Sequence, residues 1–440
     1  MPKISVIVPV YNGEKFISET LDSLVNQTLS DIEVLVVDDG SLDKTRDIVT
    51  KYCEEYPCIK YIYQKNAGVS AARNAAIPMA QGEYTVFLDS DDIFTRESLE
   101  GFYNAAKQRD ADLVIGRLKS FGAGVSAYNE YADKLSQKKE IKTYDKDLLW
   151  NFLVGNKCYK TEKLQQSGVI FPRLTYSEEG VFFTSFVYTG AKITGTENST
   201  MCYRRHTDEE GLSVSQSVNI SLVKNFIASL SAIYDNARDS FERNRSCENE
   251  EEYLQEIIYK TAHILLFQFY RHFWRADDET LSYIGAEMKR LVSQMNGETK
   301  KRFEEFNSDI CVSPLCISKE EVASSPKISV IIKKGKIKKT VDSVFESSYP
   351  YFEVFVPESC RDEIDEKHKA LPNLNILPDK NFIKDAKVRA KGEYKLCLSE
   401  KDIVDDRIFR FLIRFTAVPA FAKKLLFTSL YKAADMKISK

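Results

Sequence analysis

The chain has 440 residues, 43% hydrophobic and 29% charged, which is the composition of a globular protein large enough for two or three domains. A formal net charge of -3 gives no reason to expect nucleic acid as a partner. Nine cysteines without paired spacing and only four histidines indicate neither a disulfide framework nor a structural zinc site. We find no signal peptide pattern and no apolar run as long as a membrane span, so we expect a cytoplasmic protein.

Strand-like apolar runs alternate with helical patterns over the first hundred residues. Strands are predicted over residues 4–8, 32–37, 59–63 and 84–88. Between them, apolar residues recur at helical spacing from Phe16 to Val25 and around Ile48 and Tyr52, and an alanine-rich stretch covers residues 70–80. This alternation predicts the α/β class, with a mostly parallel sheet covered on both faces. Ligands of such sheets bind at the carboxyl ends of the strands.

An acidic cluster, Asp89-Ser90-Asp91-Asp92, follows the last of these strands. Neighbouring carboxylates resist joint ionisation, so a cation is expected among them. Mg²⁺ or Mn²⁺ takes such oxygen ligands and fills its other positions with water and phosphate oxygens. The cluster therefore predicts a phosphate-bearing substrate. Considered alone, the segment is more typical of a strand end followed by an N-cap aspartate and a solvated helix start, and that interpretation is favoured without further support.

Further support comes from the loops after the other strands. Tyr11 offers an aromatic face on which a base can stack. Asp39 can accept a hydrogen bond from a base or a ribose, and Arg73 is a fixed cation suited to a diphosphate or a base carbonyl. Each has an ordinary alternative, as a core residue, a turn and a surface cation respectively. Their order along the chain, each after a successive strand, favours nucleotide binding.

These segments, in this order, resemble the family 2 inverting glycosyltransferases of the GT-A fold: 8–12, 37–41, 66–68 with 72–74, and 87–92. The resemblance is specific through about residue 116 and continues more weakly to about Ser213. It implies a Rossmann-like, mostly parallel sheet, a nucleotide-sugar donor that is most often UDP-linked, and Mn²⁺ or Mg²⁺ at a DXD motif.

The resemblance also implies roles for individual residues. Donor contacts are implied for Pro9, Tyr11, Asn12, Glu14, Asp39, Asn66, Arg73, Asp89, Ser90 and Arg204. Of these, Tyr11 and Asp39 would hold the nucleobase, and Asp89 would lie by the ribose. Arg73 would assist at the base or the diphosphate. The metal ligands would be Asp91 with Asp89 and His206, although a lone histidine is more often structural.

The reaction implied is a single in-line displacement at the anomeric carbon, which needs a general base. Family members usually carry this base as the aspartate of a Glu-Asp-x-x-Phe segment. Residues 177–182 read Ser-Glu-Glu-Gly-Val-Phe, so Glu179 occupies the usual aspartate position. We predict Glu179 as the base, with Glu178 as a second candidate. The dipole of a helix N-terminus explains the acidic pair as well if the motif order is ignored.

The following segment, Tyr203-Arg204-Arg205-His206, resembles the family's post-catalytic segment. Either arginine could neutralise the leaving group. We expect residues 207–213 to form a loop that closes on the donor.

The rest of the chain changes character twice. Helical patterns from Val218 to Met295 predict a connector that includes a buried helix over residues 253–275. Residues 326–331, 340–344, 352–356 and 392–394 then restate residues 2–7, 20–24, 32–36 and 82–84. In this repeat Asp89 aligns with Ser399 and Asp91 with Lys401, and a lysine cannot ligate a divalent cation. We therefore predict a smaller, degenerate GT-A-like α/β domain for assembly or acceptor docking, and boundaries at 1–216, 217–320 and 321–440.

The tail, residues 409–440, mixes basic with apolar residues. Two interpretations remain open: peripheral contact with the inner face of the cell membrane, or packing on the protein's own core.

The leading hypothesis is a metal-dependent hexosyl- or N-acetylhexosaminyltransferase acting on a glycan, glycoprotein or lipid-linked acceptor. The alternatives are a sugar-phosphate nucleotidyltransferase and a non-catalytic sugar- or nucleotide-binding scaffold. The sequence specifies neither the sugar, the acceptor nor the linkage, and it leaves a homo-oligomer open.

Overall fold

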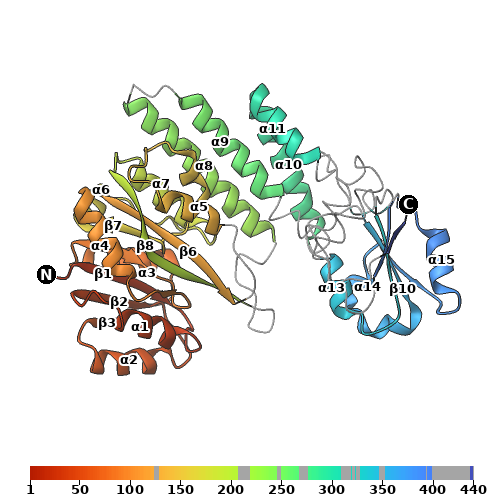
Figure 1. The fold of residues 1–440 in the computed structure, drawn as a ribbon, viewed down its shortest axis with the longest axis horizontal. Coiled ribbons are helices and arrows are strands. Elements are labelled where there is room, and N and C mark those ends of the chain that lie inside the picture. The colour runs from red at the N-terminus through yellow and green to blue at the C-terminus, as the bar shows by residue number, and fades with distance from the viewer. Residues whose placement is uncertain are drawn as a thin grey trace. The chain divides into compact units, whose positions relative to one another are not determined.

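The computed structural model describes residues 1–122, 128–206, 219–244, 249–266, 276–308, 319, 323, 328–345, 352–392, 394–398 and 437–439 (Figure 1). The chain divides into two compact units, and two of the three divisions fall within helices α8 (Ile220–Asn244) and α9 (Glu250–Ile264). The first unit comprises Met1–Ser217 with Lys224–Ile257, and the second Val218–Val223 with Ile258–Lys440. None of the described helices is both long and apolar enough to cross a membrane. The predicted three-domain division stays a prediction.

The first unit contains an eight-stranded sheet in the order β3-β2-β1-β4-β7-β6-β8-β5. Its strands are β1 (Ile4–Val10), β2 (Ile32–Asp38), β3 (Ile59–Tyr63), β4 (Tyr84–Phe87), β5 (Ile93–Phe94), β6 (Leu113–Gly122), β7 (Lys157–Lys160) and β8 (Ile193–Arg205). Strands β3, β2, β1 and β4 are parallel, and β6 is parallel to β8. Strand β7 is antiparallel to both its neighbours, β4 and β6, and β5 is antiparallel to β8. The predicted α/β class with a mostly parallel sheet is confirmed.

Strands β1 and β2 are largely apolar, as expected of interior strands in a sheet that is covered on both faces. Every residue of β1 and β2 is buried. The helices of this unit are α1 (Ile17–Val25), α2 (Thr45–Glu55), α3 (Val69–Ala76), α4 (Ser98–Arg109), α5 (Tyr128–Ser136), α6 (Thr161–Ser167) and α7 (Glu178–Val187), with the short helix η2 (Lys146–Trp150). Helix α1 buries Ile17, Leu21 and Leu24 in one cluster with β1 and β2, as its apolar spacing predicts.

The alanine-rich stretch ends its α-helix earlier than the expected residue 80. Helix α3 ends at Ala76 and a 3₁₀ turn, η1 (Ile77–Met79), follows with Pro78 in its first positions. Proline has no N–H for the α-helical bond and is tolerated at the start of a turn, which accounts for the change of helix type.

Helices follow the first sheet, as the connector pattern predicts: α8 (Ile220–Asn244), α9 (Glu250–Ile264), α10 (Asp278–Gln294) and α11 (Gly297–Ser308). The buried helix expected over 253–275 coincides with α9 as far as Ile264, and residues 267–275 lie outside the described residues.

The second unit contains a smaller, five-stranded sheet in the order β11-β10-β9-β12-β13. Its strands are β9 (Ile328–Ile332), β10 (Phe352–Pro357), β11 (Leu374–Leu377), β12 (Tyr394–Leu398) and β13 (Lys437–Ser439). Its helices are α13 (Lys338–Phe345), the short η6 (Glu358–Glu363), α14 (Glu366–Lys369) and α15 (Phe382–Arg389). The parallel order β11-β10-β9-β12 matches β3-β2-β1-β4 in the first sheet.

The two sheets also share a polar junction beside their central strands. In the first, Ser5 Oγ donates to Glu33 at 2.6 Å and accepts from the Gly82 N–H at 2.7 Å. In the second, Ser329 Oγ donates to Glu353 at 2.6 Å and accepts from the Gly392 N–H at 2.8 Å. We call each of these a Ser–Glu–Gly junction. The loss of the site in the repeat stays a prediction, because Ser399 and Lys401 lie outside the described residues, as does most of the predicted tail.

Candidate active site

The loops after β1 and β2 are tied to each other. Asn12 adopts a left-handed backbone, its N–H donates to Ser41 Oγ at 2.9 Å, and its amide oxygen accepts from the Leu42 N–H at 2.8 Å. The Glu14 carboxylate accepts from the Lys44 N–H at 3.0 Å. These contacts assemble the predicted donor loops at the carboxyl edge of the sheet.

Asp39 organises a third loop at the same edge. Its buried carboxylate accepts from the N–H groups of Ala67 and Gly68, each at 2.8 Å, and from Gln64 Nε2 at 2.7 Å. Pro9 is buried within β1, whereas Asn66 is exposed and the Tyr11 side chain has 49% of its surface open to solvent. Tyr11 is therefore available to stack on a base, and Asp39 holds the loop that leads into α3.

Arg73 on α3 connects the predicted donor residue Asp89 with the two candidate bases, Glu178 and Glu179. Its guanidinium is 2% exposed, and Nη2 donates to both Asp89 and Glu179, each at 2.7 Å. Nη1 donates to Glu178 at 3.1 Å. Although burial opposes ionisation, the three carboxylates raise the pKa of Arg73. The predicted donor residue Asp89 and both candidate bases thus share one buried cation.

Glu179 is held at the start of α7. Ser177, immediately before the helix, has a left-handed backbone, and its carbonyl accepts from Ser229 Oγ at 2.7 Å. The second carboxylate oxygen of Glu179 accepts from the Val154 N–H at 3.0 Å, and its side chain is 14% exposed. Burial raises the pKa of Glu179 to about 7 against the opposing effect of Arg73, with Asp89 and Glu178 adding to the rise. A carboxyl poised near neutral pH suits proton transfer.

Asp91 and His206 form a second cluster beside the one around Arg73. Asp91 lies in the loop between β4 and β5, and His206 directly follows β8. Their nearest atoms, Asp91 Oδ2 and His206 Nε2, are 2.7 Å apart. Burial and the charge of Asp89 raise the pKa of Asp91, and His206 opposes the rise. Ser90 is fixed through its carbonyl, which accepts from Thr20 Oγ1 on α1 at 2.9 Å.

Asp92 and Arg204 contact each other and pack next to this cluster. Asp92 is 1% exposed, and its Oδ1 accepts from the Arg204 N–H at 2.8 Å. Its Oδ2 has no hydrogen-bond partner among the described residues. Burial, then Asp91 and Asp89, raises the pKa of Asp92 well above its usual range. The Arg204 guanidinium lies over the rings of Phe16 and Phe121, and its Nε donates to the Asp91 carbonyl at 2.8 Å.

These residues fit a divalent cation. Carboxylate oxygens and an imidazole nitrogen are ligands that Mn²⁺ accepts, and Mg²⁺ accepts the carboxylates. Burial first, and then the neighbouring carboxylates, raise the pKa values of Asp91 and Asp92, and a cation would favour the ionised forms of both. Asp91 and His206 already lie together, whereas Asp89 is engaged by Arg73. Residues 207–213, the predicted closing loop, lie outside the described residues.

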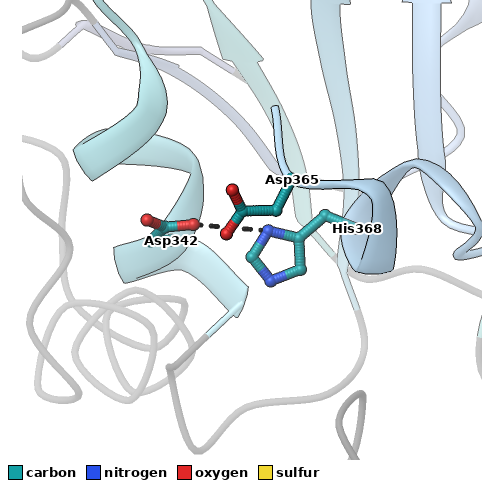
Figure 2. A group of neighbouring side chains, drawn as sticks. All are labelled: Asp342, Asp365 and His368. Atoms are coloured by element: carbon teal, nitrogen blue, oxygen red, sulfur yellow. Dashed lines mark ion pairs between the residues drawn. The ribbon is translucent and has the colours of Figure 1, made fainter. Parts of the chain in front are cut away.

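A different cluster, Asp342, Asp365 and His368 in the second unit, also has the composition of a metal site (Figure 2). Its ligand atoms lie within 4.8 Å of one another, and His368 Nδ1 is 3.3 Å from Asp342. However, Lys338 Nζ lies 2.5 Å from Asp365 and 3.5 Å from Asp342. The Lys338 ammonium therefore already pairs with both carboxylates of the cluster.

The same contact has a counterpart in the first unit. There the Tyr52 hydroxyl of α2 donates to Asp22 of α1 at 2.6 Å, much as His368 of α14 meets Asp342 of α13. His368 also stacks on Phe345, with ring centroids 4.7 Å apart. We interpret the cluster as an interhelical ion-pair network.

The region that contains most of these residues also resembles known proteins. Residues 5–166 match the family described as "Glycosyl transferase family 2". The chain therefore contains a family 2 glycosyltransferase domain, as the motif order predicts.

Curated relatives match over less than half of the chain. A Bacillus spizizenii poly(ribitol-phosphate) beta-glucosyltransferase is 37% identical over 197 residues, which are 43% of this chain and 30% of that protein. The Staphylococcus aureus poly(ribitol-phosphate) beta-N-acetylglucosaminyltransferase TarS is 34% identical over 197 residues, 43% of this chain and 33% of the relative. The match thus spans about a third of these relatives.

A solved structure supports the fold. The crystal structure of S. aureus TarS 1-349 in complex with UDP has a TM-score of 0.52 at 22% identity, and the match covers 69% of this chain and 86% of that one. The expected GT-A-like fold of the first unit is confirmed.

One contact of the site and the burial of one lysine were not predicted from the sequence. The N–H of Val154 reaches Glu179 from the main chain, and no side-chain pattern records such a contact. Lys157 belongs to the Asn-Lys-x-x-Lys stretch that precedes the base in the family pattern, but its full burial was not predicted, because a lysine is normally at the surface.

Proposed function

We propose that the first unit is a metal-dependent, inverting glycosyltransferase that moves a hexose or N-acetylhexosamine from a UDP-sugar to an acceptor hydroxyl. The observation that carries this proposal is the shared Arg73 Nη2, which lies 2.7 Å from both Asp89 and Glu179. Asp89 follows a strand whose carboxyl end belongs to the ligand edge of the sheet. The cation therefore brings a candidate base to the donor side.

In this proposal Glu179 accepts the proton of the acceptor hydroxyl while that oxygen bonds to the anomeric carbon. The bond from this carbon to the diphosphate breaks on the opposite face, and UDP leaves. Arg204 offsets charge on the leaving diphosphate. A cation held by Asp91 and His206 would supply further charge neutralisation at the phosphate oxygens.

The acceptor is proposed by chemical class. Two relatives are named for poly(ribitol-phosphate), so a polyol-phosphate polymer is the first acceptor to test, before a glycan, a glycoprotein or a lipid-linked saccharide. Cytoplasmic localisation, contact of residues 409–440 with a membrane and a homo-oligomer remain predictions.

The test uses the full chain with UDP-glucose and UDP-N-acetylglucosamine, each with and without Mn²⁺. We expect metal-dependent release of UDP, loss of turnover in Asp91→Ala, and loss of turnover with retained UDP binding in Glu179→Gln. In a separate reaction with UTP and a sugar 1-phosphate, formation of the UDP-sugar with release of pyrophosphate would instead identify a nucleotidyltransferase. UDP binding without turnover would identify a scaffold, and transfer by Glu179→Gln would assign the base to another residue.

A further inference from the structure

Lys157, the first residue of β7, is an unusual lysine. Its side chain is fully buried, and its ammonium donates to Asn156 Oδ1 at 2.9 Å, to Asn151 Oδ1 at 3.4 Å and to the Leu153 carbonyl. Within the described residues it forms no ion pair with a carboxylate. Burying an ammonium among neutral oxygens is unfavourable, and a methionine of similar length would fill the space without that penalty.

The acceptors of this ammonium lie on one short loop, residues 151–156, that precedes the strand. Two further bonds anchor the end of the loop: Asn156 Nδ2 donates to the Gly116 carbonyl at 2.9 Å, and the Lys157 N–H donates to the Val154 carbonyl at 3.1 Å. The ammonium thus draws the start and the middle of the loop toward β7.

The loop meets the candidate base at one point. The Val154 N–H donates to Glu179 Oε2 at 3.0 Å, while Arg73 holds the other carboxylate oxygen at 2.7 Å. On the far side, the Lys157 ammonium lies 4.5 Å from the ring centroid of Phe183, one helical turn beyond Glu179 on α7. Lys157 therefore contacts both the loop and the helix that fix the carboxylate.

We infer that Lys157 is a positioning residue for the reaction: its ammonium folds the 151–156 loop so that the Val154 N–H holds Glu179 in place. This inference rests on the proposed function, because it gives Glu179 the role of base. The two groups are also coupled electrostatically. Burial lowers the pKa of Lys157 to about 7, and the charge of Glu179 opposes that change.

The experiment measures UDP release from UDP-glucose or UDP-N-acetylglucosamine with Mn²⁺ in the full chain. Lys157→Met should lower kcat about 10- to 100-fold, the size expected when a catalytic group is misplaced by about 1 Å. KM for the donor and the affinity for UDP should stay within about twofold of wild type, because the donor loops are untouched. Lys157→Arg, which keeps the donors, should recover most of the rate.

The matched control is Lys160→Met on the same strand. Lys160 is partly exposed and lies 4.0 Å from Asp110, so its loss should leave kcat unchanged. If Lys157→Met does not fold, Asn151→Ala decides, since it deletes only one acceptor of the ammonium and should give the same kcat effect at smaller size.

A double-mutant cycle separates this inference from the proposed function. If Lys157 acts through Glu179, Lys157→Met should change the residual rate of Glu179→Gln by less than about twofold. A full additional loss in that background, or wild-type kcat in Lys157→Met, overturns the positioning role while the proposed function stands. Wild-type turnover in Glu179→Gln overturns the assignment of the base and this inference with it.

Discussion

At the scale of single residues, the site depends on one cation serving three acids. Arg73 can do this because its planar guanidinium presents several N–H donors at once. Nη2 contacts Asp89 and Glu179, and Nη1 contacts Glu178. A lysine at this position would carry the same charge on one nitrogen and could not reproduce the fork. Removing one partner from a buried ion pair leaves uncompensated charge and is strongly destabilising.

Arg73→Met leaves the three carboxylates without their cation and should therefore lower the free energy of unfolding of the first unit by about 3–5 kcal/mol and reduce turnover at least tenfold. Urea unfolding followed by intrinsic fluorescence measures the first effect, and UDP release the second. The control is Lys107→Met, because Lys107 is half exposed in its pair with Glu83 and such surface pairs contribute about 0–1 kcal/mol. Equal stability losses in the two variants would contradict the role of Arg73.

The pKa of Glu179 gives a pH prediction. A base must be ionised to accept a proton, and burial raises the pKa of Glu179 to about 7. Turnover should therefore be low at acidic pH and rise as the pH passes about 7. The measurement is kcat/KM for UDP release as a function of pH, with Glu179→Gln expected to lose the rise. A profile that rises near the ordinary value of about 4.3 for glutamate would contradict it.

Stability should respond to the same group with the opposite sign. The unfolded chain ionises Glu179 near its usual pKa, whereas the folded chain ionises it near 7, so the folded state binds more protons between these values. The stabilisation associated with the protonated carboxyl is present at low pH and is lost as the pH rises through 7. Glu179→Gln should remove this component from the pH dependence of unfolding in urea.

At the scale of elements, the first four strands and their approximate limits were predictable because β1 and β2 are largely apolar runs that a two-sided sheet can bury, whereas their order in the sheet was not predicted. The pairing of Arg73 with Glu178 and Glu179 was not, because about a hundred residues separate them and no local pattern records a long-range contact. The motif order placed Asp89 and Arg73 at the same edge, but as separate donor contacts. The loop contact from Val154 was equally hidden, since it uses the main chain.

The Ser–Glu–Gly junctions give a prediction for both sheets. A Cβ added at Gly82 would lie 2.4 Å from the Ser5 nitrogen, and one at Gly392 would lie 2.5 Å from the Ser329 nitrogen. Because both neighbours are backbone atoms of central strands, alanine at either position should cost about 1–3 kcal/mol or more of stability. The control is Gly285→Ala in α10, where an added Cβ would meet no atom within 4 Å and the backbone is not left-handed. Thermal unfolding, with the transitions of the two units resolved, measures these effects. If Gly392→Ala left the stability of the second unit unchanged, the two junctions would not be equivalent.

At the scale of the whole molecule, the two units differ at the edge where a donor would bind. The loop after β1 carries Tyr11, Asn12 and Gly13, whereas the loop after β9 carries Lys333, Lys334 and Gly335. Lys334 is paired with Asp379 at 3.3 Å, so this loop already uses part of its charge within the second unit. The second unit thus presents no aromatic platform at the equivalent position.

Binding of UDP with Mn²⁺ should therefore protect only the first unit. Ligands stabilise the states to which they bind, and local opening is slowed where the contacts form. In hydrogen–deuterium exchange, peptides covering β1, β4 and the loops that follow them should exchange more slowly, and peptides covering β9 and β10 should not change. Protection of β9 at the same ligand concentration would show that the second unit also binds nucleotide.

The twin junctions around Ser5 and Ser329 offer this chain an internal reference. A comprehensive mutational scan can compare tolerance at matched sites within a single polypeptide, under identical expression and selection. Substitutions that are not tolerated at either junction report what the fold of such a sheet requires. Substitutions that are not tolerated only in the first sheet report the additional requirements of the proposed catalytic site. The effects of a substitution on folding and on catalysis can then be separated within one protein.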